Sequence, residues 1–139
     1  YELSDTTLFL PDAPPAQTLR QLADALLDLL LSEDGICANR VCCAEAEAHP
    51  EAADVFFKEG PEYVTAMLTQ YLQDQVARGQ LAIPNPRHAA IQFLYMVKGE
   101  THMRALLGQA PWEQQELADY LDSCVGVFLK AYAPGGITA

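Results

Sequence analysis

The chain has 139 residues, with 19 acidic and eight basic side chains, a formal net charge of −11 at pH 7 and a pI near 4.4. Half of the residues are apolar and 19% are charged, which is typical of one globular domain rather than of a disordered segment. Apolar runs such as Leu29–Leu31 are far shorter than the roughly 20 residues of a membrane span. The acidity argues against direct binding to nucleic-acid phosphates, which requires clustered lysine and arginine.

The cysteines indicate a reducing compartment. No secretory signal pattern opens the sequence, and Cys37, Cys42, Cys43 and Cys124 are few for a chain with an ample core. We therefore expect free thiols and a cytoplasmic location.

The first half of the chain predicts four helices, each bounded by proline or glycine. Residues 15–32 place apolar side chains at helical spacing, and Asp34-Gly35 is expected to end this helix. A second helix is expected from Ile36 to Ala48, and a third from Pro50 to Glu59. Gly60-Pro61 is expected to close the third helix and to open the fourth, which Arg78-Gly79 stops.

The second half predicts two helices that are apolar on more than one side. Asn85-Pro86 is an N-cap followed by proline, and the helix that it starts is expected to end at Gly108. The last helix is expected to run from Pro111 to Tyr132. Because a helix with two apolar faces needs two partners, we expect this pair to dimerise. The distribution of charge agrees with dimerisation through these helices, because a nearly neutral surface limits repulsion between two copies. Residues 1–85 carry 14 acidic and four basic side chains, whereas residues 86–139 carry five acidic and four basic ones.

The sequence offers no convincing catalytic or metal constellation. Cys37, Cys42, Cys43 and His49 are close together, but their spacing does not direct them to one point, and small buried thiols are the simpler interpretation. A redox role for Cys42 or Cys43 and a pairing of Glu45 with His49 remain weaker alternatives. Aromatic and methionine side chains come from several of the expected helices. From composition alone, a role in the hydrophobic core is favoured over the lining of a ligand cavity.

Several short motifs in order resemble TetR/AcrR-type transcriptional regulators. They are AEAEAHPEAADVFFKEGP at residues 44–61, YL at 71–72, ARGQL at 77–81, NP at 85–86, AA at 89–90, QFL at 92–94, RALLG at 104–108 and FLKAY at 128–132. This pattern is similar to the C-terminal regulatory domain of that family and covers roughly residues 15–133. The resemblance implies an all-α domain of five or six helices, whose last two helices form a four-helix bundle across a homodimer.

The resemblance also implies a domain layout and a function. Residues 1–14 would be an irregular linker remnant, residues 134–139 a tail, and the N-terminal helix-turn-helix domain is absent from this sequence. The function implied is binding of a small, largely apolar effector without a cofactor, metal or enzymatic activity. Effector binding would control dimer geometry and hence DNA binding by the missing domain. A helical protein-interaction module and a small all-α enzyme are the alternatives.

Residue assignments combine this resemblance with helical spacing. The expected effector-binding residues are Cys42, Glu45, Phe56, Tyr63, Met67, Tyr71, Phe93 and Val97. The expected dimer-interface residues are Tyr95, Gly99, His102, Met103, Leu106, Leu117, Tyr120, Leu121, Cys124 and Phe128. Helical spacing leaves open which face of the helix from Pro86 to Leu107 lines the cavity, and His102 fits either surface.

Overall fold

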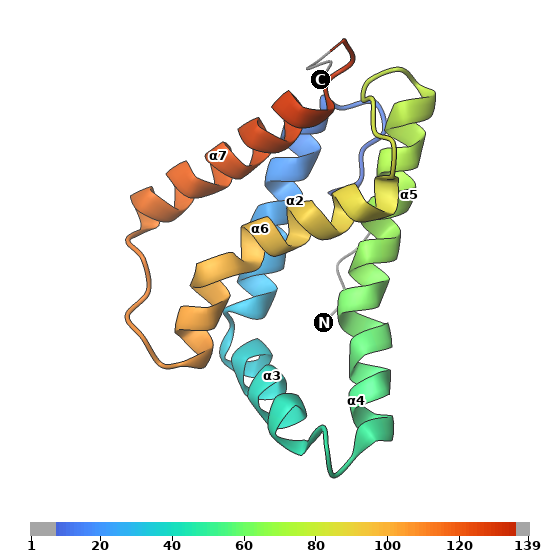
Figure 1. The fold of residues 1–139 in the computed structure, drawn as a ribbon. Coiled ribbons are helices and arrows are strands. Elements are labelled where there is room, and N and C mark those ends of the chain that lie inside the picture. Colours follow the sequence, from blue (N-terminus) through green and yellow to red (C-terminus); the bar gives the residue numbers. More distant parts are fainter. Residues whose placement is uncertain (1–7, 136–139) are drawn as a thin grey trace.

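The computed structural model describes residues 8–135, which form an all-helical domain (Figure 1). The elements are α2 (Pro15–Leu30), α3 (Glu33–Glu45), α4 (Pro50–Phe57), the π-helical turn η1 (Lys58–Glu62), α5 (Tyr63–Ala77), α6 (Pro86–Leu106) and α7 (Gln114–Tyr132). These residues contain no strand, which confirms the predicted fold class. Within the same residues, no helix is long and apolar enough to cross a membrane.

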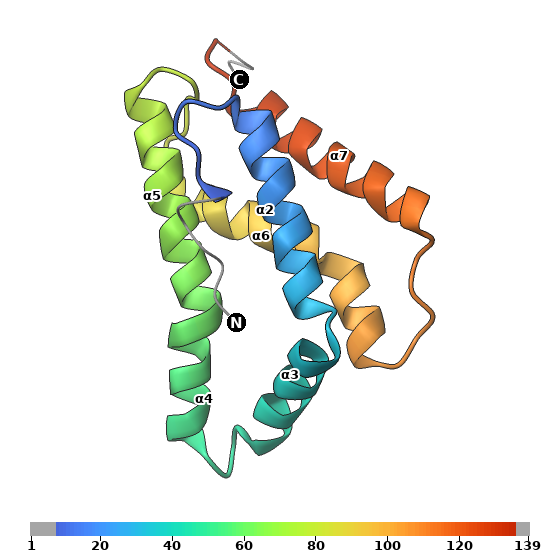
Figure 2. The same ribbon diagram turned by 180° about the vertical axis from the view of Figure 1, so that it is seen from behind.

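The core lies where α2 meets α6 and α7, and where α5 packs on α6 (Figures 1 and 2). The predicted apolar stripe of α2 is buried through Leu19, Leu22, Ala23 and Leu26. On the other side, Phe93 of α6 is fully buried and meets Phe128 of α7 edge to face, with ring centroids 5.3 Å apart. Burial of large side chains from four helices is the main stabilising contribution.

The junction of α2 and α3 differs from the sequence prediction. Gly35 does not end the first helix; it lies in the first turn of α3, which begins at Glu33 rather than at Ile36. Ser32 caps this helix, because its hydroxyl accepts a hydrogen bond from the backbone N–H of Gly35 at 3.0 Å. The two helices approach so closely that a Cβ on Gly35 would lie 2.2 Å from the carbonyl oxygen of Leu29. Glycine is therefore required by contact rather than by helix termination.

The predicted break at Gly60-Pro61 is wrong. The helix continues from α4 through η1 into α5, and the five residues of η1 form a π turn that contains Pro61. Proline lacks a backbone N–H and its ring clashes with the preceding turn of a regular α-helix, whereas a wider π turn relieves that conflict. Residues 50–77 thus form one long wall, seen along one side of Figure 1.

α6 is kinked at Gly99, which has φ 24° and ψ −129° inside an otherwise helical segment. The carbonyl of Met96, on the preceding turn, accepts a hydrogen bond from the Tyr120 hydroxyl of α7. Trp112 supports this contact, because its ring meets Tyr120 edge to face at 5.3 Å and its indole N–H donates to Glu100 at 2.8 Å. Trp112 precedes α7, which begins at Gln114 rather than at the predicted Pro111.

The segment before α2 docks onto α5. Phe9 and Tyr71 have ring centroids 5.5 Å apart, the Gln75 side-chain amide donates to the Pro11 carbonyl at 3.1 Å, and Arg78 pairs with Asp12 at 2.9 Å. Residues 8–14 of the predicted linker are therefore tied to the domain. Residues 1–7 of that linker and 136–139 of the predicted tail lie outside the described residues.

Candidate functional site

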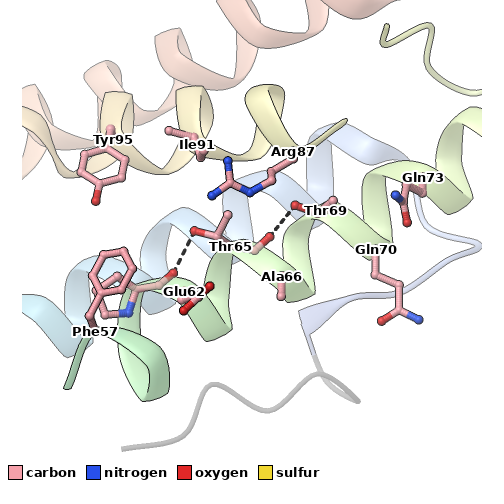
Figure 3. A pocket seen from close by; sticks show the side chains of 11 residues that line it. Phe57, Glu62, Thr65, Ala66, Thr69, Gln70, Gln73, Arg87, Ile91 and Tyr95 are labelled. Atoms are coloured by element: carbon pink, nitrogen blue, oxygen red, sulfur yellow. Dashed lines mark hydrogen bonds between the residues drawn. The ribbon is translucent and has the colours of Figure 1, made fainter. Parts of the chain in front are cut away.

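A surface groove of about 630 Å³ lies between α5 and α6 (Figure 3). One wall is the outward face of η1 and α5, preceded by Phe57 of α4, and the other wall is α6. The lining residues are Phe57, Pro61, Glu62, Thr65, Ala66, Thr69, Gln70, Gln73, Arg87, Ile91 and Tyr95. This volume lies within the roughly 300–1,000 Å³ of small-molecule sites.

The polarity of the groove changes along its length. Phe57 and Tyr95 lie at one end, Gln70 and Gln73 lie at the other, and the Arg87 guanidinium lies between them near Thr65 (Figure 3). Between them, the Thr65 hydroxyl donates to the Pro61 carbonyl at 2.8 Å, and the Thr69 hydroxyl donates to the Thr65 carbonyl at 2.6 Å. Since each hydroxyl has a single proton, both threonines present only acceptor lone pairs to a ligand.

The predicted effector-binding residues do not line this groove. Tyr71, Phe93 and Val97 are buried in the core of the domain. Cys42, Phe56 and Met67 are half-buried, and Glu45 and Tyr63 are exposed. That these eight residues bind an effector stays a prediction.

The predicted interface residues divide into two groups. His102, Leu121, Cys124 and Phe128 are buried inside the single chain, so their side chains are not free to face a partner subunit. The apolar members of this group follow the expected helical spacing, but they pack against the chain's own helices. Gly99 and Met103 are exposed, Leu106, Leu117 and Tyr120 are half-buried, and Tyr95 lines the groove.

Large apolar side chains of the last two helices are exposed outside the groove. Met103 is 55% exposed and Val127 is 56% exposed, and Leu107 follows directly after α6 with 65% exposed. Scattered apolar residues are normal on a surface, but these lie on the two helices that the sequence predicts to dimerise.

Two polar side chains, the half-buried Tyr120 and the buried His102, accompany the kink in α6. Burial raises the pKa of Tyr120 to about 12, so its hydroxyl stays a neutral hydrogen-bond donor to Met96. Burial, with a smaller contribution from Lys98, lowers the pKa of His102, whose Nε2 has no hydrogen-bond partner among the described residues. His102 is therefore neutral at pH 7 and sits in the core as an unpaired polar group.

The other predicted chemical groups show no organised site. His49 Nε2 lies 3.5 Å from a Glu45 carboxylate oxygen, but both side chains are well exposed. Cys37 and Cys43 are exposed, Cys42 is half-buried and Cys124 is buried, all as free thiols. Residues 8–135 contain no group of three histidine, cysteine, aspartate or glutamate side chains positioned to hold a metal ion.

The groove residues were missed because they carry no sequence signal. Thr65, Thr69, Gln70 and Gln73 are the polar face of an amphipathic helix, and such a face is normally solvated. Only the packing of α6 across that face makes it concave, and that packing is set by residues far away in the sequence.

The described residues form an all-helical domain with an open groove between α5 and α6. The chain matches the family model of the C-terminal domain of AefR-like transcriptional repressors over residues 17–134. It therefore belongs to this family of TetR-type regulators, which confirms the resemblance seen in the sequence. A comparison with curated proteins found no match.

Solved structures of TetR-type proteins share the fold. A protein described as a TetR-family transcriptional regulator from Mesorhizobium loti superposes with a TM-score of 0.83 and 25% identity, covering 93% of this chain and 64% of that one. The flavonoid-responsive regulator FrrA superposes with a TM-score of 0.78 and is 28% identical. The match covers 86% of this chain and 61% of FrrA. A TetR transcriptional regulator from Agrobacterium tumefaciens superposes with a TM-score of 0.72 and is 22% identical, covering 95% of this chain and 60% of that one. At this identity the likeness shows the fold alone.

These relatives are transcriptional regulators rather than enzymes. The chain matches less than two thirds of the length of each of these structures.

Proposed function

We propose that this chain is the effector-binding and dimerising half of a TetR-type transcriptional regulator. The family match over residues 17–134 carries the proposal, because it assigns the chain to the C-terminal domain of transcriptional repressors. DNA binding would then belong to a helix-turn-helix domain outside this sequence, in agreement with a net charge of −11. In this layout residues 15–133 are the regulatory domain, and the protein works in the cytoplasm where its operator DNA lies.

The proposed effector is a small, largely apolar or aromatic molecule. FrrA, which is 28% identical to this chain, is described as flavonoid-responsive, and this supports an aromatic effector class. An effector changes DNA affinity only by binding one subunit arrangement better than another. A coupling free energy of about 1–3 kcal/mol is typical of such regulation.

The proposed dimer joins the last two helices of each subunit in a four-helix bundle. The exposed side chains of Met103, Leu107 and Val127 support this arrangement, because a partner subunit would remove them from water. The near-neutral charge of residues 86–139 keeps repulsion between two copies small.

Native mass spectrometry of the purified chain tests dimerisation and effector retention together. We expect a dimer, and we expect Met103→Arg and Val127→Arg to produce monomers because each places a charge in an apolar interface. Val41→Arg is the control, since Val41 is a similarly exposed apolar residue of α3. A wild-type monomer at micromolar concentration, or a dimer that survives both substitutions, would contradict the proposed interface.

The protein-interaction module remains a second candidate, on one observation. The groove is open along the surface, and an open groove also suits a peptide segment of a protein partner. A small-molecule adduct in the mass spectrum of the purified dimer would favour the effector-binding function over this candidate.

A further inference from the structure

Arg87 differs from most other basic side chains of the protein. Among residues 8–135, Arg20, Lys58 and Arg78 pair with carboxylates, Arg40 and Arg104 donate to backbone carbonyls, and Lys98 lies over the Tyr95 ring. Arg87 and Lys130 make no such interaction with the described residues. The donors of the Arg87 guanidinium are therefore not used by any other residue in the part of the chain that the structure describes.

Helix stability does not explain why Arg87 stands at this position. It is the second residue of α6, at the positive end of the helix dipole, where a basic side chain is mildly unfavourable. Its guanidinium extends into the groove between α5 and α6 in Figure 3. A guanidinium with free donors in a concave site favours a carboxylate, a sulfonate or another anionic group.

One end of the groove suits an aromatic ring. Phe57 and Tyr95 are each about half exposed, and both rings lie at this end in Figure 3. Covering these two rings with a flat apolar ligand would remove apolar surface from water. The donors in the groove that can meet an anion include the Arg87 guanidinium and the Tyr95 hydroxyl, whereas the protons of the two threonine hydroxyls are already used.

We propose that the α5–α6 groove is the effector site and that it binds a small aromatic anion, with the anionic group on Arg87 and the ring between Phe57 and Tyr95. This inference rests on the proposed function, since it names the class of effector for the same domain. The proposed groove contains none of the eight effector-binding residues that the sequence suggested.

Anilinonaphthalene sulfonate and phenylnaphthylamine form a matched pair of probes, because the second is the same ring system without the sulfonate. We expect the sulfonate to bind and to shift the amide NMR signals of residues that line the groove. Arg87→Gln should weaken the affinity for the sulfonate about ten-fold, as expected for loss of a charge-assisted hydrogen bond. The affinity for the neutral probe should change less than about two-fold. Tyr95→Ala should weaken the binding of both probes.

Lys130→Gln is the control for net charge, because it removes the other unpaired positive charge from a position outside the groove. It should leave both affinities unchanged. Equal effects of Arg87→Gln and Lys130→Gln, NMR shifts confined to residues outside the groove, or no binding of the sulfonate would each overturn the proposal. Since Arg87 is exposed, the thermal melt of Arg87→Gln should match the wild type.

The proposed function and this inference fail in different ways. A chain that binds the sulfonate through Arg87 but stays monomeric contradicts the dimerising domain and leaves the groove site intact. A chain that dimerises through α6 and α7 but shows no Arg87-dependent binding contradicts only the groove site.

Discussion

Replacing Gly99 by alanine is a direct test of the kink in α6. A residue with a Cβ cannot adopt φ 24° and ψ −129° without backbone strain. The added methyl itself has room, since a Cβ on Gly99 would lie 3.5 Å from the Tyr120 hydroxyl oxygen. The substitution therefore isolates the backbone conformation from side-chain crowding.

The expected cost follows from two possible responses of α6. If the kink is kept, strain in a sparsely populated backbone region costs about 1–3 kcal/mol. If α6 straightens, alanine gains about 1 kcal/mol of helix propensity, but the hydrogen bond from Tyr120 to Met96 and the packing of Trp112 on Tyr120 are disrupted. We expect a net loss near 2 kcal/mol, which lowers Tm by roughly 6 °C for a domain of this size.

Thermal unfolding of wild type, Gly99→Ala, Tyr120→Phe and the double variant provides the measurement. If the kink and the Tyr120 hydrogen bond depend on each other, the two single losses in unfolding free energy will not add in the double variant. A Gly99→Ala protein that melts at a higher temperature than wild type would refute the reasoning, because α6 would then favour a straight helix.

Three further predictions concern other parts of the fold. Gly35→Ala should cost about 2 kcal/mol in urea unfolding, because its Cβ would overlap the Leu29 carbonyl, whereas Gly60→Ala has open space and should be nearly neutral. Arg40→Ala should cost about 1 kcal/mol, because it removes hydrogen bonds to two carbonyls at the end of α6; an unchanged urea midpoint would contradict this. His102 has a lowered pKa when folded, so the unfolded chain takes up its proton first as the pH falls below 6.5. Wild type should therefore lose more unfolding free energy than His102→Gln between about pH 7.5 and pH 5, and parallel pH profiles would exclude this role.

The sequence predicted the helices well because apolar spacing is a local property. Leu19, Leu22 and Leu26 follow the helical period and are all buried in α2. The same logic failed at Gly60-Pro61, where local propensity indicates a stop. Continuation through a π turn depends on packing of the following residues, such as Val64 and Leu68, in the core.

The site was less predictable than the helices. A surface groove and a subunit interface both depend on how helices pack, which the local sequence pattern does not show. Leu121, Cys124 and Phe128 are apolar at the helical phase expected for an interface, but the phase does not say whether the neighbouring side chain belongs to the same chain. The groove depends on α6 crossing the polar face of α5, and Thr65 and Gln70 look like ordinary solvated residues in the sequence. Arg87 could have been noticed only as a basic residue at the unfavourable end of a helix.

The weak attachment of α3 has a consequence for dynamics. Of its thirteen residues only Gly35 is buried, whereas α2 buries six. Besides its packing against α2, α4 and α6, α3 is held by the Ser32 cap and by the hydrogen bonds from Arg40 to the end of α6. Local opening of a helix costs little when few apolar contacts are broken. The amide hydrogens of α3 should therefore exchange with deuterium orders of magnitude faster than those of α2, which are released only when the whole domain unfolds.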